Sequence, residues 1–281
     1  MGNCFTRCFM RVQPEETVLR LLIVGLENAG KTEIAHKICG SIRTEFLQTK
    51  GCRAFHTNIE GTRVQLSEVG GAQEFLDIWK YYFLDVYGIL FVVDSSNINC
   101  INQSYNIFER LMAHDLLVGK PFLIIANKQD LPCSIDCIDL CECMNVEVLA
   151  NKYRNPCMIE VCGNWNNSDD AYDGLQSGIR WLVKTILMNK QLIMNSIKFH
   201  RGICEFESIL KASRRPWTGL SHNRSTPSLK KTRPKTAPFI SPTHLKLDVN
   251  RVWNRNIPVF VRASPIIHPE KTTIIAVTNA H

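Results

Sequence analysis

The eight residues from 25 to 32 constrain the fold of this chain more than any other stretch. They read Gly-Leu-Glu-Asn-Ala-Gly-Lys-Thr and match the pattern G-x-x-x-x-G-K-[ST]. An apolar run at 18–24 precedes them, and a helix-length segment near 31–39 follows. Successive backbone N–H groups of such a turn point inward and, with the helix N-terminus, form a concave site for phosphate oxygens. We therefore predict a phosphate-binding loop, against the alternative of a chance match in a strand-turn-helix. Its residues are Gly25, Leu26, Glu27, Asn28, Ala29, Gly30, Lys31 and Thr32.

The chain up to residue 190 alternates between strand-length and helix-length segments. The apolar runs at 18–24, 87–93 and 121–126 have the length of buried strands, and a further strand is expected at 156–161. Only Glu60-Gly61 separates residues 53–59 from 62–68, which indicates a hairpin and one antiparallel edge strand. Helices are expected near 31–39, 100–117, 134–151 and 172–190. This order predicts an α/β domain with a largely parallel sheet.

A second motif, Asn127-Lys128-Gln129-Asp130, stands at the end of the run 121–126. The carboxylate of Asp130 can accept two hydrogen bonds from adjacent donors on guanine, whereas adenine presents an acceptor there. Such a site rejects the wrong base because a buried polar group would be left unpaired. Asn127 would brace the loop and the base, and the Lys128 stem would cover the ring. Alone, the motif is also compatible with a helix N-cap by Asp130, but its place after a strand and a phosphate loop predicts bound GTP or GDP.

These segments resemble the Arf and Arf-like branch of the Ras superfamily of small GTPases over residues 18 to about 190. The resemblance rests on GLENAGKT, on EVGG (68–71) followed by IWKYYF (78–83), on FVVDSS (91–96) and on PFLIIANKQDLP (121–132). The chain is most similar to the cilium-associated ADP-ribosylation-factor-like protein thirteen group, whose phosphate loop also carries Asn at the position of Asn28. The resemblance implies the P-loop small GTPase fold, with a largely parallel six-stranded sheet, one antiparallel edge strand and helices on both faces.

The resemblance also assigns roles to particular residues. Lys31 would reach the terminal phosphates as a catalytic residue, and the hydroxyl of Thr32 would ligate Mg²⁺. Thr49 corresponds to the first switch threonine, which closes on Mg²⁺ and the γ-phosphate, although Gln48 and Lys50 depart from the family pattern. Gly71 would contact the nucleotide as well. Cys162 and Gly163 correspond to the last guanine-contacting loop, which acts mainly through backbone N–H groups.

One loop departs from the family. Glu68 stands where the family has an Asp that holds the magnesium shell, so we expect Glu68 to act through water, with weakened or rearranged Mg²⁺ binding. The residue after Gly70-Gly71 is Ala72, where the family has the Gln that orients the attacking water. Gln73 lies one position later and could rescue this catalytic role, but we interpret it by default as a solvated loop residue. GTP hydrolysis is therefore expected to be slow.

The net charge of the 281-residue chain changes sign near residue 190. The 92 residues from 190 to 281 hold 16 basic and 4 acidic residues, whereas the preceding part is acidic. We predict three regions: a lipidated segment at 1–17, a GTPase domain at 18–190 and a basic, Pro/Ser-rich tail at 191–281 that is mostly disordered. The tail could contact anionic lipid or an acidic partner, and Lys230–Lys235 could be a nuclear signal, but solvated disorder is the simpler interpretation. No nucleic-acid partner is expected.

Twelve cysteines raise the alternatives of disulfides and metal ligands. In a cytosolic chain of this length we expect reduced, partly buried thiols. Cys133, Cys137 and Cys141 are four residues apart and would share a helix face, with Cys143 beside them. This spacing lacks the Cys-x-x-Cys knuckles of zinc sites, so we favour a buried helix face over zinc.

The N-terminus Met1-Gly2-Asn3-Cys4-Phe5-Thr6 fits the myristoylation pattern M-G-x-x-x-[ST]. Gly2 is the predicted acceptor, with Cys4 and Cys8 as palmitoylation candidates, because one myristoyl chain gives only marginal membrane binding. An unmodified, disordered N-terminus is the alternative. No apolar run is long enough for a transmembrane helix, and no signal peptide is evident. We expect a cytoplasmic, membrane-associated protein. Arg11-Val12-Gln13-Pro14 resembles a short ciliary targeting signal, which makes the cilium a candidate location.

Three functions remain open on this basis. The chain could be a GTPase switch whose segments near 41–52 and 69–85 respond to the γ-phosphate and recruit effectors. It could be a nucleotide-loaded scaffold, or an exchange factor for another Arf-like GTPase, with little hydrolysis. It could be a nucleotide-free pseudo-GTPase, which the intact Lys31, Thr32, Asn127, Lys128 and Asp130 argue against. The exchange factor, activating protein and effectors of the chain itself cannot be identified from the sequence.

Overall fold

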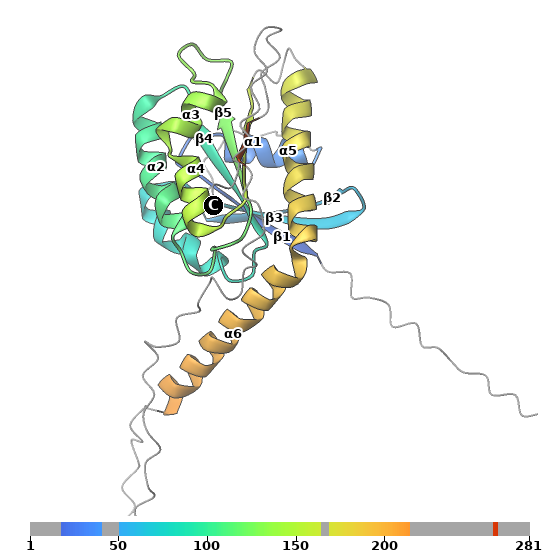
Figure 1. Cartoon of the computed structure of the whole chain (residues 1–281), viewed down its shortest axis with the longest axis vertical. Coiled ribbons are helices and arrows are strands. Elements are labelled where there is room, and N and C mark those ends of the chain that lie inside the picture. The colour runs from blue at the N-terminus through green and yellow to red at the C-terminus, as the bar shows by residue number, and fades with distance from the viewer. Residues whose placement is uncertain (1–17, 41–50, 164–168, 214–260, 264–281) are drawn as a thin grey trace, which may run out of the picture. The chain divides into compact units, whose positions relative to one another are not determined.

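The computed structural model describes residues 18–40, 51–163, 169–213 and 261–263 (Figure 1). They fall into two compact units, one with the residues up to Ile197 together with 261–263, the other beginning at Lys198. The strands are β1 Leu19–Val24, β2 Cys52–Ile59, β3 Thr62–Val69, β4 Gly88–Asp94, β5 Phe122–Asn127, β6 Cys157–Val161 and β7 Val261–Ala263. The helices are α1 Lys31–Ile38, the 3₁₀ helix η1 Gln73–Tyr82, α2 Ile98–Met112, α3 Cys137–Cys143, α4 Val146–Tyr153, α5 Asp169–Met188 and α6 Lys190–Ser213.

The strands form one sheet in the order β2-β3-β1-β4-β5-β6-β7. Only β2 and β3 pair antiparallel, through the turn at Glu60 and Gly61, whose φ values are 48° and 79°. All other neighbours are parallel. The small GTPase fold and its antiparallel edge strand are therefore confirmed, and β7 adds a seventh strand to the six that we expected.

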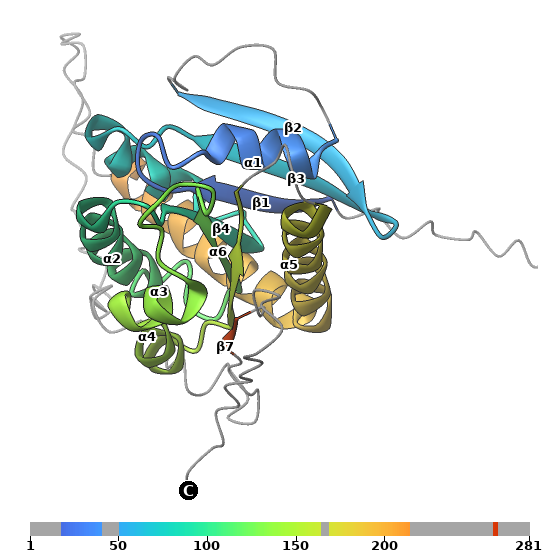
Figure 2. The same ribbon diagram turned by 90° about the horizontal axis from the view of Figure 1, so that it is seen from above.

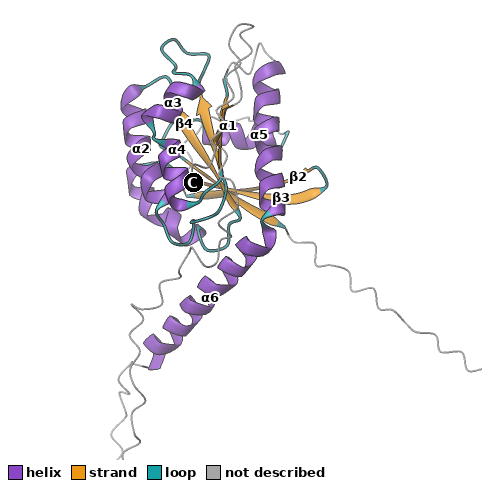
Figure 3. Ribbon diagram, viewed as in Figure 1, coloured by secondary structure: helices purple, strands orange, loops and turns teal. Residues whose placement is uncertain are grey.

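Helices cover both faces of this sheet. Figures 1 and 2 show α1 and α5 on one face and α2, α3 and α4 on the other, and Figure 3 shows how strands and helices alternate. Strands β4 and β5 are apolar except for their last residues, Asp94 and Asn127, because both of their faces are covered. All six residues of β5 and the first six of β4 are buried, which makes these strands a rigid support for the loops at their C-terminal ends.

The helix expected at 134–151 is two helices in the structure. Helix α3 begins after Asp136, whose carboxylate accepts hydrogen bonds of 2.8 Å from the backbone N–H groups of Ile138 and Asp139. Asn145, with a φ of 46°, separates α3 from α4 because a left-handed residue cannot continue a helix. Cys133 is exposed in a turn before α3, so the shared helix face that we expected is wrong for Cys133. It is confirmed for Cys137 and Cys141, which lie on α3 and pack against the core.

The cysteine chemistry can be examined for the ten cysteines in the described ranges. All ten are free thiols. Within these ranges no group of three or more His, Cys, Asp or Glu side chains could hold a metal ion. Burial raises the pKa of Cys157 and of Cys162 well above the ordinary thiol value. These thiols act as small apolar core residues in the part of the chain that the structure covers.

The tail is more regular than we expected at two places. Residues 191–213 belong to helix α6, and residues 261–263 form β7. The helix could have been predicted, because residues 190–213 contain no proline and only one glycine, Gly202. Ile193 and Ile197 are buried in its first turns. The remainder of the predicted tail, and the predicted N-terminal segment 1–17, lie outside the described residues. Among the described helices, none combines the length and apolarity that a membrane span requires.

Candidate nucleotide-binding site

The phosphate loop connects the end of β1 to the start of α1. Gly30 precedes the helix with a φ of 93°, a left-handed conformation that glycine adopts without strain. A Cβ at Gly30 would also lie 2.1 Å from Nδ2 of Asn127, so a side chain is excluded there. The chain therefore reverses at the helix N-terminus with its backbone close to the Asn127 motif. This is the arrangement that the G-x-x-x-x-G-K-[ST] pattern predicts.

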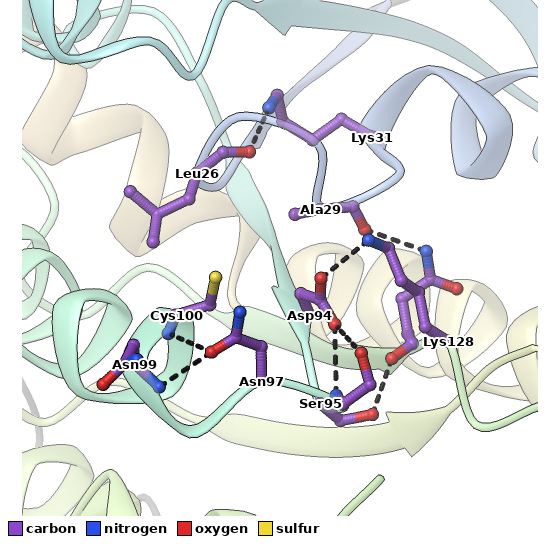
Figure 4. Close-up of polar contacts among 11 residues, drawn as sticks. Leu26, Ala29, Lys31, Asp94, Ser95, Asn97, Asn99, Cys100 and Lys128 are labelled. Carbon is purple, nitrogen blue, oxygen red and sulfur yellow. Dashed lines mark hydrogen bonds and ion pairs between the residues drawn. The ribbon is translucent and has the colours of Figure 1, made fainter. Parts of the chain in front are cut away.

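Lys31 folds back over this loop. Its Nζ donates a 2.7 Å hydrogen bond to the backbone oxygen of Leu26, and the residue is 6% exposed (Figure 4). Burial lowers the pKa of Lys31 to about 8, against the opposing charges of Glu68 and Glu27. A negatively charged phosphate beside Nζ would stabilise the protonated form of Lys31. The site therefore suits an anionic ligand.

Thr32 and Glu68 bring two oxygen atoms together beside the loop. The Thr32 hydroxyl donates a 2.5 Å hydrogen bond to Oε1 of Glu68, and both residues are buried. A hydroxyl and a carboxylate fit Mg²⁺, which takes one or two protein oxygens and completes its shell with water and phosphate. Glu68 thus keeps contact with Thr32 despite its extra methylene. Thr49, the other predicted metal residue, lies outside the described residues.

The loop after β3 packs directly against the phosphate loop. The indole Nε1 of Trp79 donates a 2.9 Å hydrogen bond to the backbone oxygen of Gly70. A Cβ at Gly71 would lie 2.3 Å from the backbone oxygen of Gly25 and 2.5 Å from Nζ of Lys31. Gly71 therefore stands beside the lysine that would reach the terminal phosphate, with no room for a side chain.

The two residues after Gly71 are placed differently. Ala72 has extended backbone and precedes η1, whereas Gln73 begins η1 with an exposed side chain. Within the described residues no hydrogen bond holds the Gln73 side chain toward Lys31 or Thr32. The catalytic role of Gln73 therefore stays a prediction.

The base-binding motif is tied to the phosphate loop through Asn127. This residue is 2% exposed, and its Nδ2 donates a 2.8 Å hydrogen bond to the backbone oxygen of Ala29. Its buried Oδ1 accepts no hydrogen bond from the described residues, which leaves an acceptor for a ligand. One amide side chain therefore fixes the distance between the phosphate and base ends of the site.

Lys128 and Asp94 form an ion pair under the same loop, with 2.6 Å between Nζ and Oδ2 (Figure 4). Asp94 also accepts a 2.6 Å hydrogen bond from the Ser96 hydroxyl. Burial raises the pKa of Asp94, but the hydrogen bonds from Lys128 and Ser96 outweigh it and hold this pKa below its usual value. Asp94 holds the Lys128 stem in place, a role that we did not predict. The sequence feature that could have indicated this role is a charged residue at the end of an apolar strand. In the sheet, Asp94 pairs with Asn127.

The last predicted contacts lie next to Asp130. The backbone N–H of Gln129 donates a 3.0 Å hydrogen bond to the backbone oxygen of Cys162. A Cβ at Gly163 would lie 2.9 Å from Oδ1 of Asp130, whose carboxylate is exposed. The structure therefore brings together the predicted residues at 25–32, 68–71, 127–130 and 162–163. It leaves open the predicted lipidation sites Gly2, Cys4 and Cys8, which lie outside the described residues.

Comparison with known proteins shows the family and the fold of this chain. The ADP-ribosylation factor family matches residues 5–186, which is well over half of the chain. Among solved structures, the Arl6 BBS3 small GTPase from Trypanosoma brucei, with the bound nucleotide analogue GppNp, has the same fold. Its TM-score is 0.52 and its identity 23%, over 61% of this chain and 99% of that chain. The family match, together with the phosphate and base motifs in one site, shows that this chain belongs to the ADP-ribosylation factor family of guanine-nucleotide-binding GTPases.

Proposed function

We propose that the chain is a nucleotide-dependent switch that holds GTP for long periods and recruits partners in that form. Guanine-nucleotide binding follows from the family, and slow hydrolysis is the step that we add. The observation that carries it is the contrast within one loop. Gly71 is positioned against Lys31, but Ala72 stands at the position of the water-orienting residue, and Gln73 is exposed. The loop keeps the means to detect a terminal phosphate and lacks a group to position water.

In this proposal the residues of the site have distinct tasks. Lys31 neutralises charge on the terminal phosphates, and Asn127 fixes the spacing between phosphate and base. Asp130 selects guanine through two hydrogen bonds to its edge, while Lys128, held by Asp94, covers the ring. Thr32 and Glu68 would hold Mg²⁺, which neutralises phosphate charge when bound, with Glu68 acting through water.

We further propose that the switch acts at a membrane. The support is the myristoylation pattern at Gly2 with Cys4 and Cys8 nearby, since two acyl chains give stable anchoring where one does not. A ciliary location is favoured by the Arg11-Val12-Gln13-Pro14 motif and by the resemblance to the ADP-ribosylation-factor-like protein thirteen group. Mass spectrometry of the protein purified from ciliated cells tests the acylation, and Gly2→Ala should release it from membranes. Cys204→Ser, a change at an exposed cysteine of α6, is the control.

A scaffold or exchange factor for another Arf-like GTPase is the second candidate, because Ala72 would be tolerated where hydrolysis is not required. The two candidates differ in turnover. A switch should hydrolyse bound GTP slowly but measurably in a single-turnover assay, whereas a scaffold should retain it. An exchange factor should in addition accelerate release of labelled GDP from an Arf-like partner.

Nucleotide identity provides the first experiment. The nucleotide bound to the purified full chain is extracted and identified, and affinities for GTP, GDP, ATP and XTP are measured with Mg²⁺. Asp130→Asn should exchange the preference for guanine with one for xanthine, because the amide donates where the carboxylate accepts. Asp139→Asn, at an exposed carboxylate of α3, should bind like the unchanged chain. If the unchanged chain bound ATP as well as GTP, or no nucleotide at all, the proposal would be wrong.

A further inference from the structure

The two edges of the described sheet differ in exposure and in the segment that forms them. Strand β2 ends the sheet on one side, and most of its residues are exposed or half-buried. On the other side β6 has β7 as its neighbour, with Cys157 beside Val261, Met158 beside Arg262 and Ile159 beside Ala263 (Figure 2). The three paired residues of β6 are 0% exposed. Among the described residues, no strand lies outside β2, whereas β6 is covered by a segment from far along the sequence.

The covering segment comes from the basic tail. Strand β7 has only three residues, and residues 214–260 separate it from helix α6. Its pairing with β6 is parallel, which requires a long crossover connection of this kind. Helix α4 lies beside β7 in the same unit, so the strand packs into the GTPase domain. The tail therefore contributes a structural element to the domain.

The strength of this pairing can be judged from its size. Three residues of a parallel ladder supply few hydrogen bonds, and each contributes little net free energy because the free strand bonds to water. Against them stand the ordering of the strand and the closure of a long connection. The net free energy of the pairing is therefore a small difference between opposing contributions, and we infer that β7 can leave the edge and return.

We propose that the outer edge of β6 is a strand-docking site that the chain fills with its own residues 261–263. An extended segment of a partner can pair with the sheet only after this strand has left. Recognition would be through the backbone groups of β6, as in other cases of strand addition to a sheet edge. An unpaired β6 edge would also be prone to pairing with other chains, so the tail strand protects it. This inference does not depend on the proposed nucleotide function.

Hydrogen exchange of the full chain tests the docking. Val261→Pro/Arg262→Pro removes two backbone N–H groups, at least one of which faces β6 in a parallel ladder. We expect exchange of the β6 amides that face β7, within residues 157–159, to become about tenfold faster or more, with β4 and β5 unchanged. The control is Val277→Pro/Thr278→Pro, two prolines in the same tail outside β7. Equal protection of β6 in the unchanged chain and the Val261→Pro/Arg262→Pro chain would overturn the proposal.

A synthetic peptide with residues 256–268 tests the site in trans. The tail strand belongs to the same chain as β6 and therefore competes at an effective concentration on the order of millimolar. The labelled peptide should therefore bind the double-proline chain at least tenfold more tightly than the unchanged chain. A scrambled peptide of the same composition controls for charge. Equal affinity of the 256–268 peptide for both chains, or of both peptides for the double-proline chain, would contradict a β6 site that residues 261–263 occupy.

A third measurement does not require the proline variant to fold. A photoreactive amino acid placed at Arg262 should crosslink within its own chain to residues of β6 or α4. Crosslinks only between two chains would show that the strand is exchanged between copies, and crosslinks elsewhere in the domain would show that the edge is not its site. Either result would overturn the proposal. Guanine-nucleotide binding, measured on the same samples, reports separately on the proposed function.

Discussion

The two sides of the nucleotide site differ in how fully they keep the residues typical of the family. The side formed by the phosphate loop and the 127–130 motif is tied by buried hydrogen bonds, such as that from Asn127 to Ala29, and every motif residue is kept. The side formed by residues 68–73 keeps its two glycines and its Trp79 contact, but it has Glu68, Ala72 and an exposed Gln73. Binding and phosphate detection depend on the first side and on Gly71. Hydrolysis depends on the positions that differ. Under the function proposed above, the chain therefore binds GTP and detects its terminal phosphate, while it hydrolyses GTP slowly.

Gly71→Ala should cause the largest change, because it places a methyl group between the two sides. The added Cβ would lie 2.3 Å from the oxygen of Gly25, so the backbone must move, and we expect GTP affinity to fall by roughly 100-fold. GDP affinity should fall less, since Lys31 adjoins the methyl group and serves the terminal phosphate. Isothermal titration with both nucleotides measures this difference. Gly202→Ala, at an open position of α6, is the control, and an equal loss for GTP and GDP would contradict phosphate detection by Gly71.

Asn127→Ala should have the next largest effect, because it removes the contact between the phosphate loop and the 127–130 motif. It removes a buried hydrogen bond to Ala29, and a loss of about 1–3 kcal/mol corresponds to roughly 10- to 100-fold weaker binding of both nucleotides. Asn106→Ala removes a similar side-chain bond of 3.2 Å from the exposed face of α2, and it should leave nucleotide affinity unchanged. Competition binding with fluorescent GDP gives both values. Unaltered affinity in Asn127→Ala would mean that the two loops are held together by other contacts.

Lys120→Met tests how η1, the helix that follows the divergent loop, is held at its far end. The buried Nζ of Lys120 donates a 2.9 Å hydrogen bond to the backbone oxygen of Phe83, directly after η1. Burial lowers the pKa of Lys120 to about 7 in the folded chain, against the opposing charge of Asp85. The unfolded chain therefore binds more protons between pH 7 and about 10.5, and stability should rise with pH in that window.

The expected slope from Lys120 approaches about 1.4 kcal/mol per pH unit and vanishes below pH 7, where both states hold the proton. Lys120→Met should remove this slope, while Lys80→Met, at an exposed lysine of η1, should retain it. Urea unfolding between pH 6 and 10 measures the difference, and other ionisable groups cancel in the comparison. Parallel curves for the unchanged chain and Lys120→Met would show that Lys120 keeps its ordinary pKa.

The sequence predicted the features that depend on neighbouring residues and missed those that depend on distant segments. Local patterns predicted the strands, the Glu60-Gly61 turn and the phosphate loop, because each depends on neighbouring residues. Asp94 and Trp79 were missed, since their contacts with Lys128 and Gly70 join segments that only the folded sheet brings together. The break at Asn145 was missed because the apolar pattern continues across it. Strand β7 could not be predicted, because three residues in a polar tail carry no periodic signal and the pairing depends on a distant edge.

The smallest expected effect concerns Gln73, and it examines the divergent side directly. Its side chain is exposed at the start of η1, so Gln73→Ala should change the single-turnover rate of GTP hydrolysis by less than about twofold. Ala72→Gln should raise that rate by about tenfold or more, because it puts an amide on the residue that follows Gly71. Nucleotide affinity should stay constant in both variants, since the binding side is untouched. A large loss in Gln73→Ala would mean that η1 shifts when GTP binds and carries Gln73 toward the phosphate. In that case the displaced glutamine would still serve the reaction, and the resetting of the switch would depend on the movement of η1.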